Sequence, residues 1–354
     1  MKKKEIRREK ERYDRVLGDR KVFEMTPEEL EQPITKEMGE LCRHRLEKRW
    51  FRRLIAINVA MIILVVGVFV ANFTDNLDFG RQYLNQMKEE IMESLESEEE
   101  DAGEEETEEE SADEEVTDAE TEEEELTEED IPFEVSAFFY GLFTLIITLL
   151  ALYYLYAQQI TMSLRITERN FPEVYQIIED YSRRLGIPVP KAYVKQEKGV
   201  LNAFSAFLIK RQWICINAEL FEVAYREHHD MDSLKFVIAH ELAHIYYGHS
   251  TLHYNLLVFF AKLIPVVSSI ASRTREYSCD RLAQRLTGVD GIEAMLVLVV
   301  DRHLYKMVDK EDYINEMRAC KGFFVWYYNL LADHAIMSKR ILALEEGRGS
   351  GALY

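Results

Sequence analysis

The stretch FVIAHELAHIYYGHS, Phe236–Ser250, contains the pattern H-E-x-x-H at His240, Glu241 and His244. Residues four apart on a helix share one face, so two imidazoles at this spacing can bind the same metal ion. Glu241 borders the same site and is a candidate base for a metal-bound water. A buried helix that carries two histidines by chance is the alternative explanation of the pattern.

Local signals favour a helix over this stretch. Asp232 or Ser233 is expected to be its N-cap, and Gly248 is a natural end. The apolar residues at helical spacing are Leu234, Val237, Ile238, Leu242 and Ile245.

The metzincin pattern requires a third histidine ligand six residues after the second. No histidine lies six residues after His244. Gly248 and His249 lie four and five residues after His244, so neither is in register. We therefore expect His249 to point away from the face of the two histidines, as a residue of the helix end.

A carboxylate further along the chain can complete the site. The stretch SRTREYSCDRLAQRL, residues 272–286, places Glu276 and Asp280 four apart on a second predicted helix. Catalytic zinc sites use three protein ligands and a water. We therefore predict one Zn²⁺ per chain, bound by His240, His244 and Glu276. Asp280 is predicted to accept the free N–H of a ligating histidine.

The charge of the chain is concentrated in one tract. The 354 residues have a net charge of −21, but residues 89–130 hold 26 of the Asp and Glu residues among 42 positions and no Lys or Arg. The remainder has a balance of +5 and shows no basic stripe with interleaved aromatics, so nucleic-acid binding is not expected. The tract cannot bury enough apolar surface to fold and is predicted to be disordered.

Two uncharged runs are long enough to cross a bilayer, residues 54–74 and 135–157. Basic residues crowd the entry to the first run, whereas only Arg81 and Lys88 lie between the runs. By the positive-inside rule the N-terminus and everything after the second span are cytoplasmic. The chain is thus predicted to be a multi-pass protein of the cell membrane, with its acidic loop outside. Four cysteines without a disulfide-like spacing agree with a reducing compartment for the larger domain.

These boundaries divide the chain into five parts. They are a charged cytoplasmic segment (1–53), interpreted as solvated rather than as a docking arm, a transmembrane helix (54–74), the acidic loop (75–134), a second transmembrane helix (135–157) and a zinc-binding domain (158–354). The fold class expected for that domain is α+β, mainly helical with a small sheet. Strands are predicted at 191–194, 200–209 and 212–216, and further helices at 172–185, 291–307, 322–333 and 339–345. The apolar stretch 253–272 is interpreted as a core or membrane-surface segment rather than a third crossing.

The motifs resemble those of the HtpX-type membrane zinc endopeptidases, relatives of the CAAX prenyl proteases in the gluzincin group. The matching sequences are HELAHIYYGH, SRTREYSCDR, NAFSAF (Asn202–Phe207) and DHAIMSKRILAL (Asp333–Leu344). The resemblance covers about residues 165–344 and implies a zincin-like metalloprotease domain.

The resemblance also implies roles for individual residues. His240, His244 and Glu276 correspond to zinc ligands, and Glu241 to the catalytic base. Asn202 and Ala203 would line the substrate, His334 is a candidate for stabilising the oxyanion, and Arg340 would order the end of the domain. Ala335 stands where the family usually has proline after the histidine. Two spans do not form a multi-spanning prenyl protease chamber, so cleavage of prenyl peptides is not expected.

Two functions of different kinds are compatible with these residues. The first is a membrane-anchored zinc endopeptidase that cleaves polypeptides, in particular misfolded membrane proteins, in quality control. The second is a non-catalytic membrane scaffold or sensor, with a structural zinc site and an acidic loop that binds cations or a partner. Glu241 favours the first, because a structural site has no need of a base. Nothing in the sequence indicates the oligomeric state.

Overall fold

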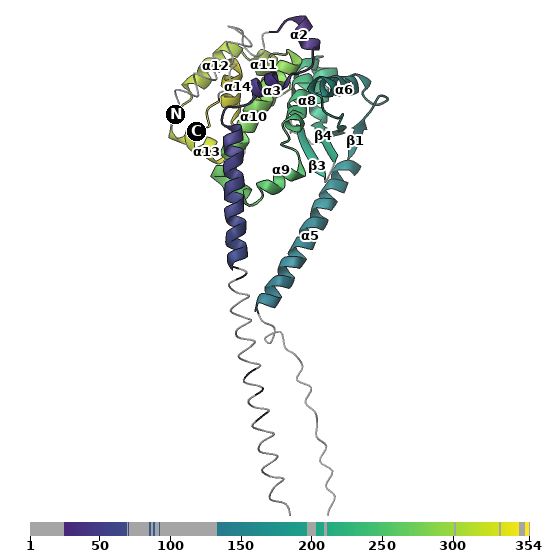
Figure 1. Cartoon of the computed structure of the whole chain (residues 1–354). Helices are drawn as coiled ribbons and strands as arrows, with labels where there is room; N and C mark the ends of the chain where they lie inside the picture. Colours follow the sequence, from purple (N-terminus) through teal and green to yellow (C-terminus); the bar gives the residue numbers. More distant parts are fainter. Residues whose placement is uncertain are drawn as a thin grey trace, which may run out of the picture. The chain divides into compact units, whose positions relative to one another are not determined.

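The computed structural model describes residues 25–68, 70, 85, 88, 92, 133–196, 203–208, 211–300, 302–332, 334–346 and 351–353. By its contacts the chain divides into two units, Met1–Met61 with Tyr154–Tyr354, and Ile62–Tyr153. The predicted disordered loop lies almost wholly outside the described residues. Figure 1 shows the first unit as a group of helices beside a small sheet.

The central element of the first unit is the helix α8, Met231–Tyr246. Its apolar stripe is buried, with Leu234, Ile238 and Leu242 each 0 % exposed. The N-cap is Asp230, whose side chain accepts the backbone N–H groups of Asp232 and Ser233. The expected cap at either of these two residues is therefore wrong, since the helix begins at Met231.

The second long helix of the unit, α10 (Pro265–Thr287), packs against α8. Proline at its first position suits a helix start, because its missing N–H would have no partner there. The helix ends at Gly288, which has a φ of +68° that favours glycine. Together α8 and α10 supply most of the residues around the candidate site.

A mixed four-stranded sheet lies beside α8, in the order β1-β2-β4-β3. The parallel pair is β2 (Lys191–Lys195) with β4 (Arg211–Asn217), and the other two pairs are antiparallel. The edge strand β3, Ala203–Leu208, contacts α8. The predicted strands are thus present and α+β is confirmed. The short edge strand β1, Ser163–Ile166, was not predicted; it has only four residues.

Shorter helices cover the rest of the unit. The predicted helix 291–307 is wrong beyond Val300, because residues 305–307 form a separate 3₁₀ helix whose Tyr305 hydroxyl bonds to Asp230 at 2.5 Å. The further helical elements are α2 (Pro27–Glu31), α3 (Lys36–Cys42), α6 (Pro172–Leu185), α7 (Ala218–Glu222), the π-helix η2 (Val223–Glu227), α9 (Leu252–Leu257), η3 (Phe260–Leu263), α11 (Gly291–Val300), η4 (Tyr305–Met307), α12 (Lys310–Ala319), α13 (Phe323–Leu331) and α14 (Met337–Glu346).

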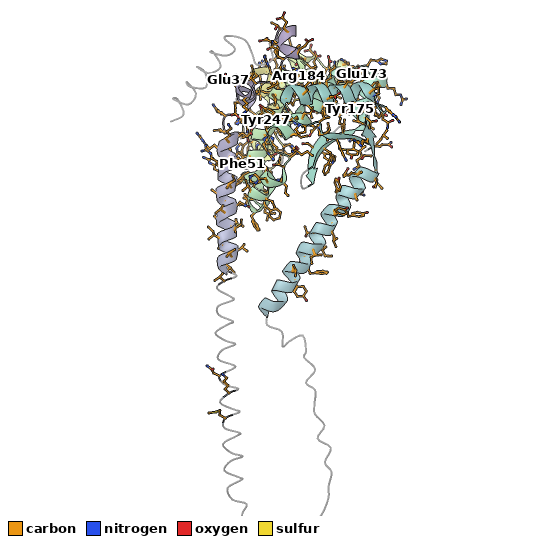
Figure 2. All side chains as sticks on the ribbon, turned by 45° about the vertical axis from the view of Figure 1, so that its right-hand side comes forward. Glu37, Phe51, Glu173, Tyr175, Arg184 and Tyr247 are labelled. Carbon is orange, nitrogen blue, oxygen red and sulfur yellow. The ribbon has the colours of Figure 1, made fainter. Side chains whose placement is uncertain are left out.

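The N-terminal segment packs on the domain that follows the acidic loop. Leu41 and Cys42 of α3 are buried in the main core, and the Tyr247 hydroxyl donates a hydrogen bond to the Gly39 carbonyl at 2.8 Å. Phe51 stacks on Tyr254 with ring centroids 4.6 Å apart, and Figure 2 labels Phe51 and Tyr247 at this junction. The expectation of a solvated segment, made for residues 1–53, is therefore wrong for most of residues 39–51.

One helix in the described part of the chain, Glu47–Val68, is long and apolar enough to cross a membrane. It contains the start of the predicted first span. The predicted second span lies within α5, Phe133–Thr161, and its crossing of a membrane stays a prediction.

The cap of α8 can be tested by substitution. Replacing Asp230 with Ala removes the acceptor of two backbone N–H groups and of the Tyr305 hydroxyl. We expect the free energy of unfolding to fall by about 1–2 kcal/mol in chemical denaturation of the detergent-solubilised protein. Asp230→Asn keeps a capping oxygen and should lose less. Equal unfolding midpoints for Asp230→Ala and the unsubstituted protein would contradict the assignment.

Candidate metal centre

The helix α8 brings His240 and His244 to one face, one turn apart. Their Nε2 atoms are 3.2 Å from each other, and the rings meet edge to face. His240 is buried and His244 is partly buried. The two Nε2 atoms therefore lie close enough to bind one ion, as the spacing predicted.

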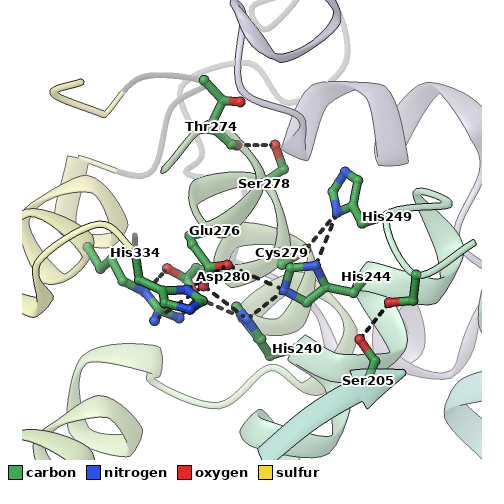
Figure 3. A network of polar contacts seen from close by, with 12 residues as sticks. Ser205, His240, His244, His249, Thr274, Glu276, Ser278, Cys279, Asp280 and His334 are labelled. Atoms are coloured by element: carbon green, nitrogen blue, oxygen red, sulfur yellow. Dashed lines mark hydrogen bonds and ion pairs between the residues drawn. The ribbon is translucent and has the colours of Figure 1, made fainter. Parts of the chain in front are cut away.

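Glu276 of α10 provides a carboxylate at the same point. Its Oε2 is 3.5 Å from His240 Nε2, and its Oε1 is 3.6 Å from His244 Nε2. The ligand atoms of these three residues all lie within 4.8 Å of one another. Figure 3 shows the carboxylate beside the two imidazoles.

The separations of these atoms fit zinc. Two ligands bound tetrahedrally to Zn²⁺ at 2.0–2.2 Å are about 3.3–3.6 Å apart. The three observed separations are 3.2, 3.5 and 3.6 Å. Two imidazole nitrogens and a carboxylate are also a donor set that zinc accepts. The residues present therefore fit one zinc ion.

Asp280, itself held by Arg340, orients His240 from the side of the ring opposite the metal position. Asp280 Oδ1 is 2.8 Å from His240 Nδ1, which directs Nε2 toward the metal position. Arg340 holds both oxygens of Asp280, at 2.8 and 2.6 Å, and its Nη1 is 3.4 Å from Glu276. The sequence predicted the contact of Asp280 with a histidine. It assigned Arg340 only to the end of the domain, because nothing in the spacing shows that α14 returns to α10.

When no metal is bound, the imidazole of His240 is protonated at neutral pH. Burial lowers the pKa of His240, but hydrogen bonds to Asp280 and Glu276, with their charges, raise it to about 10. Burial opposes ionisation of Glu276, yet its contacts with His240, His334 and Arg340 hold the pKa of its carboxyl well below the usual value. A zinc ion at this point must therefore displace a proton from His240.

Glu241 lies beside the ligands with a different environment. Its side chain is buried, and burial raises the pKa of its carboxyl, with a smaller opposing effect from the charge of His240. Ser205 of β3 hydrogen-bonds to Glu241 and lies 2.7 Å from the hydroxyl of Ser250. Sequence reasoning missed Ser205, although the two-residue period of a strand places it on the same face as Ala203.

The remaining predicted site residues are His334, Ala203 and Asn202. His334 Nδ1 is 3.4 Å from Glu276 Oε1, and its side chain is 72 % exposed, so it borders the site on the solvent side. Ala203 lies on β3, two residues before Ser205. Asn202 lies outside the described residues. The roles of these three toward a substrate stay predictions.

A second group of possible ligands shares His244. His244, His249 and Cys279 also bring ligand atoms within 4.8 Å of one another. Burial raises the pKa of the Cys279 thiol well above its ordinary value, so the thiolate that zinc prefers is disfavoured. The group with Glu276, whose carboxylate stays ionised, fits zinc better.

The pKa of His240 predicts a pH dependence of metal binding. Since the pKa is raised, the proton is present across neutral pH and must leave as zinc enters. The apparent zinc affinity should rise about tenfold per pH unit between about pH 6.5 and 8. Competition with a chelator of known pH-corrected affinity measures this. In Asp280→Asn the slope should be shallower. An affinity independent of pH in the unsubstituted protein would contradict the electrostatic argument.

Comparison with known proteins agrees with this geometry. Residues 168–258 match the model of Peptidase family M48. The matched range contains β2, β3, β4 and α8 with the H-E-x-x-H residues, and it ends before Glu276. No curated protein matches the chain. The match covers less than half of the chain and supports a metallopeptidase, and the peptidases of this family generally use zinc.

Proposed function

We propose that the protein is a membrane-anchored zinc endopeptidase of the HtpX type. The observation that carries this proposal is the meeting of His240, His244 and Glu276 at one point, with Glu241 beside them. When bound, zinc would polarise a peptide carbonyl and lower the pKa of a water. The carboxylate of Glu241 accepts the proton of the attacking water and returns it to the leaving amine.

The position of Glu241 suits this work. A general base is most effective when its pKa is near the working pH, and burial moves Glu241 in that direction. Asp280 and Arg340 keep His240 oriented throughout the reaction. His334, exposed beside Glu276, is the candidate donor for the developing negative charge on the carbonyl oxygen.

The edge strand β3 is the candidate substrate platform. In the described part of the chain β3 pairs with β4 alone, so its other edge can accept an extended polypeptide. Ser205 connects this edge to Glu241, and Figure 3 shows it on the strand near the histidines. Backbone pairing recognises extended chains with little regard to sequence, which suits misfolded proteins as substrates.

The alternative, a scaffold with a structural zinc site, is less well supported. Structural zinc sites usually have four protein ligands, whereas in the described residues three groups gather at this point. The open position and the adjacent buried carboxylate are features of a catalytic site.

Exposure of the helix Glu47–Val68 supports the membrane anchor. A core helix of a soluble protein would be buried, but only 11 % of the apolar window of this helix is buried. Val59, Ile63 and Val66 are each close to half exposed or more. The basic residues before the helix support a cytoplasmic position of the catalytic unit, and α5 is proposed as the second crossing.

The segment after α8 is proposed to enter the membrane surface. Asn58 of the anchor helix accepts the backbone N–H of Phe260 at 2.7 Å and donates to the Leu256 carbonyl at 3.4 Å. Asn58 lies four residues into the predicted span, about 6 Å along the helix. Near this depth the side chains of Leu256, Phe259 and Leu263 are 60, 56 and 67 % exposed. The helices α9 and η3, with six and four residues, are too short to cross.

Substitution of the base tests the catalytic proposal. Glu241→Gln should lower the rate of cleavage of an unfolded protein substrate by about 10²–10⁴-fold, because the proton acceptor is lost. Zinc content, measured by metal analysis, should stay at one per chain. Glu179→Gln, at an exposed position of α6, is the matched control and should keep full activity. Undiminished cleavage by Glu241→Gln would rule out the mechanism.

Spin labels test the membrane surface. Cysteines placed at 256 and 259 in a Cys320→Ser background, where the other cysteines are buried, would carry nitroxides in the full chain in lipid vesicles. We expect collisions with oxygen to exceed those with a water-soluble nickel complex at both positions. A label at Glu179 should show the reverse order. Water-like accessibility at 256 and 259 would refute membrane contact by the segment that follows α8.

A further inference from the structure

A line of polar side chains leads from the metal site to the beginning of the anchor helix. His244 Nδ1, the ring nitrogen opposite the metal position, is 3.1 Å from His249 Nδ1. His249 Nε2 is 3.2 Å from the Oε1 of Glu47. Figure 3 shows the contact between the two imidazoles. Glu47 is the first residue of the helix Glu47–Val68.

The carboxylate at the end of this line is fixed in place. Glu47 is 5 % exposed, and it accepts hydrogen bonds from Arg43 Nη1 at 2.5 Å and from the Ser278 hydroxyl. Burial opposes its ionisation, but His249, Arg43 and Ser278 together lower the pKa of the Glu47 carboxyl. Glu47 is therefore a buried, ionised acceptor with a rigid position.

Only one distribution of protons satisfies all the contacts while His244 binds a metal. A ligating Nε2 has no proton, so His244 carries its proton on Nδ1 and donates it to His249 Nδ1. His249 then carries its own proton on Nε2 and donates to Glu47.

We propose that His249 and Glu47 are positioning residues that hold His244 in the orientation and tautomer required for metal binding. Asp280 orients His240 by direct contact with its Nδ1. Glu47 orients His244 in the same way, but through the imidazole of His249, which lies between the carboxylate and the ligand. This inference rests on the proposed zinc site. It makes the metal centre depend on the first residue of the anchor helix, which lies outside the residues matched by the family.

A purely structural role of these buried groups is the competing explanation. His249 also lies 3.7 Å from Cys279 Sγ, and Glu47 ties the anchor helix to α10 through Ser278. On this explanation, loss of either side chain disturbs packing without acting on the ligand. A buried histidine outside the line, His44, which contacts the Gly351 carbonyl at 3.3 Å, provides the matched control.

The test measures zinc affinity in the full detergent-solubilised chain by chelator competition. His249→Leu should weaken zinc binding by about 10–100-fold, the usual effect of losing such a partner, and Glu47→Leu by about tenfold. His249→Gln, whose amide can accept from His244 and donate to Glu47, should restore most of the affinity. His44→Leu should stay within about threefold of the unsubstituted protein.

The outcomes separate the two proposals. If the unsubstituted chain binds no zinc, the proposed function fails and the positioning role fails with it. If it binds zinc and a folded His249→Leu variant binds equally well, only the positioning role is overturned. Should His249→Leu fail to fold, nitrogen-15 spectra of the histidines in the unsubstituted, zinc-loaded protein decide. They should show the proton of His249 on Nε2, and a proton on Nδ1 instead would overturn the proposal.

Discussion

The structure of the catalytic unit depends on the contact between α8 and α10, which buries the Glu276 carboxylate between two imidazoles. A carboxylate taken out of water is costly unless it is paired. Here Arg340 serves Asp280 and Glu276 together, and His240 supplies a proton when the ion is absent. A divalent ion would replace that proton and neutralise the remaining charge. Metal binding and the packing of α8 against α10 therefore both depend on the balance of charge at this site.

The spacing of the motifs predicted the core of this site. His240 and His244 are four positions apart, which places both on one helix face. The same spacing relates Glu276 to Asp280, so one carboxylate faces the ion while the other supports a histidine. The sequence cannot show which distant elements return to this point. Arg340 on α14 and Glu47 before the anchor span are far away in the chain, and their contacts follow from tertiary packing alone.

The fold was predicted where local signals are strong. The strands next to β4 and the helix α6, which starts at Pro172 and ends at Gly186, follow from apolar runs and from Pro and Gly placement. The prediction from local signals was wrong where tertiary contacts decide the outcome. Asp230, which caps α8, also binds the Tyr305 hydroxyl from another element. Part of the N-terminal segment is buried in the core although its composition is charged. The strand β1, with only four residues, was not predicted.

The first part of the anchor helix, up to Met61, groups with the catalytic unit by its contacts. Glu47 at its start reaches His249, and Asn58 eleven residues later binds the segment that follows α8. The same helix that would fix the protein in the bilayer therefore supports a metal ligand at one point and positions an apolar surface at another.

The central claim is that zinc binds to two imidazoles and a carboxylate. X-ray absorption at the zinc edge of the purified full chain tests it most directly. The account predicts nitrogen and oxygen neighbours only, at about 2.0–2.2 Å, with the multiple-scattering signal of imidazole. A sulfur neighbour at about 2.3 Å would instead place the ion at Cys279 and contradict the account.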